Sequence, residues 1–206
     1  MKNKKNNNIQ DCKVVLLGDS GVGKSSIIAR YLSGFFKDDI LSTFSATYSQ
    51  KIYEKNGKRI RLNIWDTAGQ EEFRSLGRLF YKDAYIICLV FDVTHKQSFN
   101  NLKEIWYPDV KEYGEKYKII ALVGNKGDLY EVEEVNEEEI NSFKDEINGK
   151  YFFVSAKNGQ GIDKLFKSMA ESFLNPEFLV KIDDNESLKS IQLDNHIIKK
   201  KKKNCC

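Results

Sequence analysis

The sequence predicts an α/β domain with a mostly parallel six-stranded sheet, one antiparallel hairpin at its edge, and helices on both faces. Four short apolar runs are typical of strands buried on both faces, at residues 14–17, 85–91, 119–123 and 151–154. Helix-length segments separate these runs, which favours parallel strands joined by crossover helices. Two further strand-like runs, at 49–54 and 59–65, flank Asn56 and Gly57, and Asn-Gly between two strands is the strongest short signal for a hairpin.

The composition divides the chain into three parts. Residues 1–11 are rich in Asn and Lys and predict a disordered N-terminal extension. Residues 12–175 carry the apolar periodicity of one domain and are numerous enough to enclose a core. Residues 176–206 are polar and charged, and they predict a tail with no core of its own.

Helices within the domain have separate signals. Residues 26–32 follow the first strand and are expected to end at Gly34. Asn136, with Glu139 three residues later, predicts the start of a helix over 137–147. Residues 161–174 place apolar side chains on one face at helical spacing. Pro108 lies in another helical segment and is expected to kink or end it.

Charge and cysteine patterns exclude several classes of protein. The net charge of +3 falls to about −5 without the eight lysines near the two ends, at positions 2, 4, 5 and 199–203. We therefore expect a neutral-to-acidic domain with a basic tail, and no nucleic-acid partner. The four cysteines form neither a disulfide framework nor a zinc-site spacing. The chain shows neither a signal peptide nor a long apolar span, so we expect an intracellular protein made soluble.

The segment GDSGVGKS, residues 18–25, matches the pattern of a phosphate-binding loop between a strand and a helix. Backbone N–H groups in such a loop surround phosphates, and the helix N-terminus adds a favourable dipole. Lys24 is expected to reach the outer phosphates, and Ser25 to ligate Mg²⁺. The loop alone indicates only a nucleoside triphosphate. The residues expected to contact it here are Ser20, Gly21, Val22, Gly23, Lys24, Ser25 and Ser26.

Two segments that follow buried strands predict a guanine site. NKGD, residues 125–128, comes directly after the third buried strand, at the same sheet edge as the phosphate loop. Asp128 can accept hydrogen bonds from the ring N–H and exocyclic amine of guanine, groups that adenine lacks. SAK, residues 155–157, can offer a backbone N–H to the guanine carbonyl. The expected base contacts are Asn125, Lys126, Asp128, Ser155, Ala156 and Lys157.

WDTAGQE, residues 65–71, supplies the remaining chemistry of a nucleotide hydrolase. Asp66 can hold Mg²⁺ through a water molecule, and the Gly69 N–H can contact the γ-phosphate. Gln70 can orient the attacking water.

With these motifs in this order, the chain resembles a small GTPase of the Ras superfamily over residues 12 to about 174. The resemblance implies the P-loop GTPase fold, with Gln70 and Lys24 as catalytic residues. It also implies that Thr43 ligates Mg²⁺ and contacts the γ-phosphate, and that Phe36 packs across the guanine edge. Intrinsic GTP hydrolysis is then slow, about 10⁻⁴ to 10⁻³ per second, and a partner arginine accelerates it.

Within that superfamily the chain resembles the Rab branch. Tyr48, Trp65 and Phe80 match the positions of its aromatic surface triad. The chain departs from the usual Rab pattern at Ile40, Ser45 and Asp83. Two segments are called switches in this family: switch I is the loop around Thr43, and switch II runs from Trp65 to about residue 84. The resemblance implies a monomer whose switches bind an exchange factor, a GTPase-activating protein and effectors of vesicle transport.

The tail ends in IIKKKKKNCC. Resemblance to Rab tails implies that Cys205 and Cys206 are geranylgeranylated with the help of a Rab escort protein, and that a GDP-dissociation inhibitor extracts the GDP form. Two lipid chains anchor stably, and nearby lysines add attraction to an anionic leaflet, here Lys199, Lys200, Lys201, Lys202 and Lys203. The expected location is the cytoplasmic face of intracellular membranes, with a cytosolic GDP-bound pool. A basic tail with unmodified thiols and a nuclear-localisation signal are the alternatives for this segment.

Two other function classes also fit a phosphate-binding loop. A nucleotide kinase would need a second substrate pocket and an arginine-rich lid, and the ordered NKGD and SAK motifs argue against it. The second alternative is a scaffold with the GTPase fold that does not hydrolyse GTP. The residues needed for hydrolysis argue against it, since all are present: Lys24, Ser25, Thr43, Asp66 and Gln70.

Overall fold

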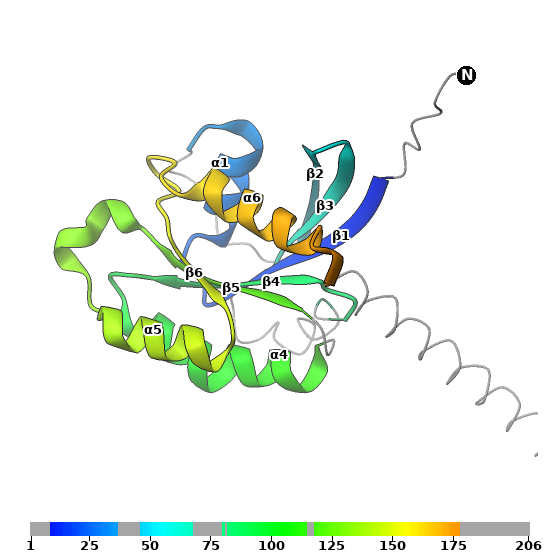
Figure 1. The fold of residues 1–206 in the computed structure, drawn as a ribbon. Helices are drawn as coiled ribbons and strands as arrows, with labels where there is room; N and C mark the ends of the chain where they lie inside the picture. The colour runs from blue at the N-terminus through cyan, green and yellow to red at the C-terminus, as the bar shows by residue number, and fades with distance from the viewer. Residues whose placement is uncertain (1–8, 37–45, 68–79, 81, 115–117, 178–206) are drawn as a thin grey trace, which may run out of the picture.

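The computed structural model describes residues 9–36, 46–67, 80, 82–114 and 118–177. Its centre is one six-stranded sheet in the order β2-β3-β1-β4-β5-β6 (Figure 1). The β2–β3 pair is antiparallel and every other neighbouring pair is parallel, so the predicted sheet is confirmed. The strands are β1 (Ile9–Leu17), β2 (Thr47–Lys55), β3 (Lys58–Asp66), β4 (Ile86–Asp92), β5 (Ile119–Asn125) and β6 (Lys150–Phe153).

Helices cover both faces of this sheet, as predicted. In Figure 1, α1 and α6 lie on one face, whereas α4 and α5 lie on the other. Each face has its own core cluster, because β1, β4 and β5 are apolar on both sides. The helical elements are α1 (Lys24–Ser33), α3 (Lys96–Asn101), the π-helix η2 (Leu102–Trp106), α4 (Tyr107–Tyr113), the 3₁₀-helix η3 (Gly127–Val132), α5 (Glu137–Glu146) and α6 (Ile162–Phe173).

The edge hairpin is built on the predicted Asn-Gly turn. Asn56 and Gly57 have φ values of 52° and 75°, and the strands they join pair from Lys55 opposite Lys58. A two-residue turn of this kind requires positive φ at both positions, which Asn and Gly tolerate best.

Strand β1 begins earlier than the sequence analysis expected. The prediction assigned residues 1–11 to a disordered extension, but Ile9, Gln10 and Asp11 pair with β3. The Asp11 carboxylate also accepts hydrogen bonds from Arg61 and Asn63, at 3.2 and 2.9 Å. These partners lie about fifty positions away, so the local composition gave no sign of them. Residues 1–8 lie outside the described part of the chain.

Of the two outcomes predicted for Pro108, a kink or an end of the helix, the end does not occur. The chain passes from α3 through the π-helix η2 into α4, where Pro108 occupies the first turn and the helix continues to Tyr113. The backbone is helical at Trp106 and Tyr107, so Pro108 lies within one continuous helical run, just after its π turn. The π turn before Pro108 is wider than an α-helical turn and leaves room for the proline ring, and the α-helical pattern then resumes.

Helix α5 starts as the sequence predicted. The Asn136 side chain accepts a hydrogen bond from the backbone N–H of Glu139 at 2.8 Å, just before Glu137. Asn136→Ala should lower the free energy of unfolding by about 1 kcal/mol, because the substitution leaves a first-turn N–H without its cap. Urea denaturation measures the loss. Asn136→Ser should keep most of the stability, and equal losses in the two variants would contradict the capping role.

Two sequence expectations concern cysteines and membrane spans. Cys12 and Cys88, the two cysteines in the described part of the chain, are buried and free. Burial raises the pKa of the Cys88 thiol to about 12, so it stays protonated. Among the residues that the structure describes, no helix has the length and apolar character needed to cross a membrane.

Candidate functional site

The loop of residues 18–23 joins the end of β1 to the start of α1 and depends on glycine at two positions. A Cβ on Gly18 would lie 2.1 Å from the carbonyl oxygen of Val90 on β4. A Cβ on Gly23 would lie 2.3 Å from the side-chain nitrogen of Asn125, and Gly23 has a φ of 93°. The loop therefore packs closely on β4 and β5, and it leads directly into the N-terminus of α1.

The ammonium of Lys24 is folded back over this loop. It donates hydrogen bonds to the carbonyl oxygens of Gly18 and Asp19, at 2.7 and 2.8 Å, and the residue is only 5% exposed. Burial lowers the pKa of Lys24 to about 8, although Asp66 and Asp19 oppose that shift. A buried ammonium at a helix N-terminus suits a polyanionic ligand, which would restore the lost solvation.

Ser25 and Asp66 bring together the oxygen atoms expected to face a metal ion. The Ser25 hydroxyl donates to an Asp66 carboxylate oxygen at 2.6 Å, although the residues are 41 positions apart. Asp66 is 4% exposed at the end of β3. A hydroxyl and a carboxylate are the hard oxygen ligands that Mg²⁺ prefers, so the residues present fit that ion.

The burial of Lys24 predicts a pH dependence of stability in the nucleotide-free protein. Its folded pKa, about 8, lies below the ordinary value of 10.5, so the unfolded chain binds more protons between these values. The free energy of unfolding therefore rises with pH in that window. Relative to Lys24→Met, which cannot titrate, the wild type should gain about 1–2 kcal/mol from pH 7 to about pH 9.5. Urea unfolding measures the difference, and parallel pH curves would contradict it.

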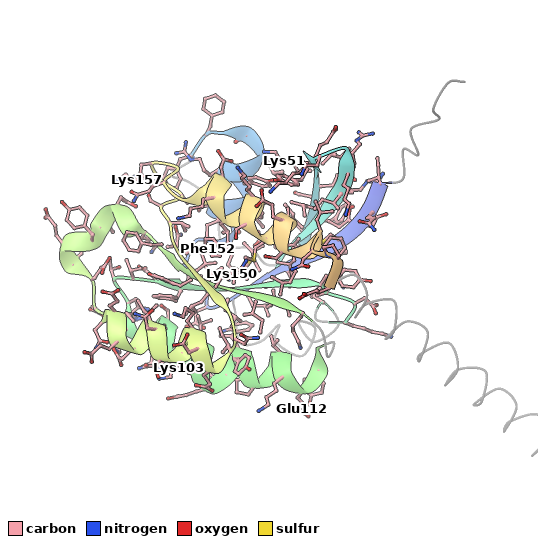
Figure 2. The ribbon with its side chains drawn as sticks, in the orientation of Figure 1. Lys51, Lys103, Glu112, Lys150, Phe152 and Lys157 are labelled. Atoms are coloured by element: carbon pink, nitrogen blue, oxygen red, sulfur yellow. The ribbon has the colours of Figure 1, made fainter. Side chains whose placement is uncertain are left out.

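Next to the loop lies an open pocket of about 290 Å³. Nine of the residues that line it belong to the predicted nucleotide contacts, from three segments far apart in the sequence: Gly21, Gly23, Ser26, Phe36, Asn125, Lys126, Asp128, Ala156 and Lys157. Leu129 also lines the pocket and was not predicted. Lys157 lies on the loop after β6 beside α1 (Figure 2). The pocket therefore joins the phosphate loop to the NKGD and SAK segments.

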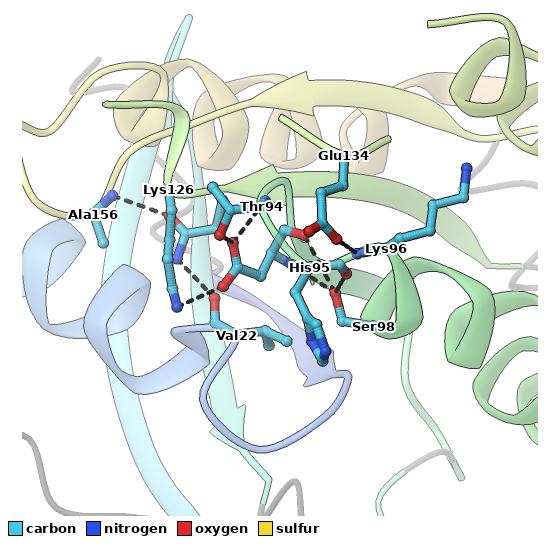
Figure 3. A network of polar contacts seen from close by, with 10 residues as sticks. Val22, Thr94, His95, Lys96, Ser98, Lys126, Glu134 and Ala156 are labelled. Atoms are coloured by element: carbon cyan, nitrogen blue, oxygen red, sulfur yellow. Dashed lines mark hydrogen bonds and ion pairs between the residues drawn. The ribbon is translucent and has the colours of Figure 1, made fainter. Parts of the chain in front are cut away.

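Asn125 links these three segments through its side-chain amide (Figure 3). Its nitrogen donates to the Val22 carbonyl of the phosphate loop at 2.8 Å. Its oxygen accepts from the Ala156 N–H at 3.1 Å. The residue is 2% exposed, so both groups need the partners they have.

The Asp128 carboxylate is held from one side. The buried Ser155 hydroxyl donates to it at 2.6 Å, and the same hydroxyl accepts from the Asn158 N–H at 3.2 Å. This arrangement orients one carboxylate oxygen toward the protein while Asp128 itself lines the pocket. A fixed carboxylate at a pocket wall can select a ligand that presents N–H donors.

Asp92 is a site residue that the sequence analysis missed. Its carboxylate pairs with the Lys126 ammonium at 2.6 Å, and it accepts from the Thr94 hydroxyl at 2.8 Å (Figure 3). The Lys126 backbone has a φ of 66°, in the left-handed region that is uncommon for residues other than glycine. The signal available in the sequence was position, since Asp92 ends β4 as Asn125 ends β5.

The predicted aromatic surface triad forms a continuous group at the β2–β3 edge. The ring centroids of Tyr48 and Trp65 lie 5.2 Å apart, and those of Trp65 and Phe80 lie 5.3 Å apart. Tyr48 is 51% exposed. Other predicted residues lie outside the described part of the chain, namely Thr43, Gly69, Gln70, Lys199 to Lys203, Cys205 and Cys206, together with the departures Ile40 and Ser45.

Comparison with known proteins places the chain in a family. The model of the Ras family matches residues 13–175. The chain is similar to GTP-binding protein YPTM2 of Zea mays, with 39% identity over 160 residues, which cover 78% of each chain. Ras-related protein RABD2a of Arabidopsis thaliana is 38% identical over 160 residues, again 78% of each chain. Ras-related protein Rab-21 of Mus musculus is 37% identical over 162 residues, or 79% of this chain and 72% of that protein. The chain therefore belongs to the Ras family of small GTPases, with Rab proteins among its relatives.

Proposed function

We propose that this protein is a Rab-like switch that binds GTP or GDP with Mg²⁺, hydrolyses GTP slowly, and recruits effectors to membranes in vesicle transport. The observation that carries this proposal is one pocket lined by both Asp128 and the phosphate loop. Ser155 holds the Asp128 carboxylate, and Asn125 ties its own segment to the loop through the Val22 carbonyl. Guanine presents two adjacent N–H donors to such a carboxylate, and adenine would leave it without them.

The phosphates of the nucleotide would lie over residues 20–26. Backbone N–H groups of the loop and the Lys24 ammonium would bind them. Ser25, Thr43 and Asp66 would hold Mg²⁺, which neutralises charge on the outer phosphates when it is bound. The guanine would enter the pocket beside Phe36, with Asp128 on its donor edge and a backbone N–H of residues 155–157 at its carbonyl oxygen.

Hydrolysis in this proposal depends on residues of switch II. Gln70 would orient the attacking water, and the Gly69 N–H would contact the γ-phosphate. We expect an intrinsic rate of about 10⁻⁴ to 10⁻³ per second. A GTPase-activating protein that inserts an arginine would raise it by about 10³ to 10⁵.

Membrane attachment and partner binding use other parts of the chain. Cys205 and Cys206 would carry geranylgeranyl groups, and five neighbouring lysines would strengthen binding to an anionic leaflet. Effectors would bind the switch regions and the triad of Tyr48, Trp65 and Phe80. The GDP form would return to the cytosol with a GDP-dissociation inhibitor.

Nucleotide content and turnover test this function directly. Protein purified in Mg²⁺ without added nucleotide, then denatured, should release close to one equivalent of GDP or GTP and no adenine nucleotide. Reloaded with GTP, it should release phosphate in a single slow turnover. Tightly bound GTP that is not hydrolysed would favour the scaffold alternative. Transfer of phosphate to a nucleoside monophosphate would favour a kinase.

A further inference from the structure

The Arg30 side chain, in the last turn of α1, donates hydrogen bonds to three backbone carbonyl oxygens. Its Nε donates to the Ala156 carbonyl oxygen at 2.8 Å, and one terminal nitrogen donates to the Gly34 carbonyl oxygen at 2.7 Å. The other terminal nitrogen donates to the carbonyl oxygen of Lys157. Three nitrogens of one half-buried guanidinium thus hold three backbone carbonyls, from residues as far as 127 positions away.

Two of these carbonyls belong to residues that line the nucleotide pocket, and the third lies two positions before another lining residue, Phe36. The first two lining residues are Ala156 and Lys157. Gly34 ends α1 with a φ of 76°, and its N–H donates to the Arg30 carbonyl oxygen at 2.9 Å. Phe36 follows two positions later and also lines the pocket. Arg30 therefore joins the SAK loop to the C-terminal end of α1, which leads into the segment that carries Phe36.

We propose that Arg30 is a positioning residue that sets the lifetime of the bound guanine nucleotide. It holds residues 156–157 and the end of α1 at a fixed separation, and Arg30 itself does not line the pocket. When the residues around a ligand are already fixed in place, binding costs less conformational entropy, and the ligand dissociates more slowly. This inference rests on the proposed function.

The chemistry of the guanidinium explains why arginine suits this position. Its donors form a rigid planar fork that can serve three acceptors in different directions, whereas a lysine ammonium is a single point on a flexible stem. Lysine would keep the charge and part of the hydrogen bonding. An unbranched apolar side chain such as methionine would keep only the packing along the stem. The expected order of nucleotide lifetime is wild type, then Arg30→Lys, then Arg30→Met.

Release of fluorescent methylanthraniloyl-GDP from the full chain tests the proposal. Arg30→Met should release it about tenfold faster than the wild type, the effect of losing about one charge-assisted hydrogen bond. Arg30→Lys should fall between them. The same ratios should persist in EDTA, because the contacts lie on the base side and not at the metal. Single-turnover hydrolysis of preloaded GTP should be unchanged.

The matched control is Arg61→Met, which removes another partly exposed guanidinium, paired with Asp11 on the far part of the sheet. It should release the nucleotide at the wild-type rate. Equal release from Arg30→Met and wild type would overturn the proposal, as would a difference that vanishes in EDTA. If Arg30→Met does not fold, Arg30→Lys decides by the same criterion. Failure of the wild type to bind the nucleotide would instead refute the proposed function.

Discussion

Asp128→Asn should weaken the binding of GDP and GTP about 10²-fold and should improve the binding of xanthosine nucleotides. The carboxylate accepts a hydrogen bond from Ser155 at 2.6 Å, and an asparagine oxygen can accept the same bond. The substitution therefore changes only the second carboxylate oxygen, the one that does not face Ser155, and replaces this acceptor by an NH₂ donor. Guanine would then face donor against donor, while xanthine presents a carbonyl oxygen at that edge.

Competition binding with fluorescent GDP measures both effects. Asp145→Asn is a suitable control, because Asp145 is exposed on α5 and pairs with Lys144 away from the pocket. It should bind every nucleotide as the wild type does. Unchanged affinity of Asp128→Asn for GTP would refute the base-site assignment.

Gln70→Leu should slow intrinsic GTP hydrolysis about tenfold and abolish most of the acceleration by a GTPase-activating protein, which is worth about 10³ to 10⁵. The leucine cannot hydrogen-bond the attacking water, so the nucleophile loses its orientation. Affinity for GTP should stay the same, since the base and phosphate contacts are untouched. The variant should therefore remain loaded with GTP and retain effectors.

Single-turnover phosphate release from preloaded protein measures the rate apart from nucleotide exchange. Gln50→Leu, on the exposed face of β2, makes the same chemical change away from switch II and should hydrolyse GTP at the wild-type rate. Equal rates for Gln70→Leu and the wild type would show that another group orients the water.

The parts of the fold that the sequence predicted well are those with local causes. Apolar runs marked the buried strands because β4 and β5 need hydrophobic side chains on both faces. The turn at Asn56 and the cap at Asn136 depend on residues within three positions of each other. The phosphate loop was recognised for a similar reason, since its glycines, Lys24 and Ser25 are contiguous in the chain.

One error arose where a distant partner outweighs the local pattern. Ile9 to Asp11 look like part of a polar extension, yet β3 offers them a strand to pair with. Pro108 was expected to kink or end its helix, and only the second outcome is excluded, because the helix continues from the π turn to Tyr113. The strand that pairs with Ile9 to Asp11 lies about fifty positions away, outside the short window in which a pattern can be read.

The sequence by itself determined the order of the elements, and it predicted the phosphate loop and the residues that we propose select guanine and hold Mg²⁺. Only the tertiary structure decided how these segments are held together. Asp92 pairs with Lys126, and Arg30 joins the SAK loop to the end of α1, through contacts that the local sequence does not show. An arginine on a helix and an aspartate after a strand are ordinary in a sequence. Their roles follow from which carbonyls and charges the sheet topology brings within hydrogen-bond distance.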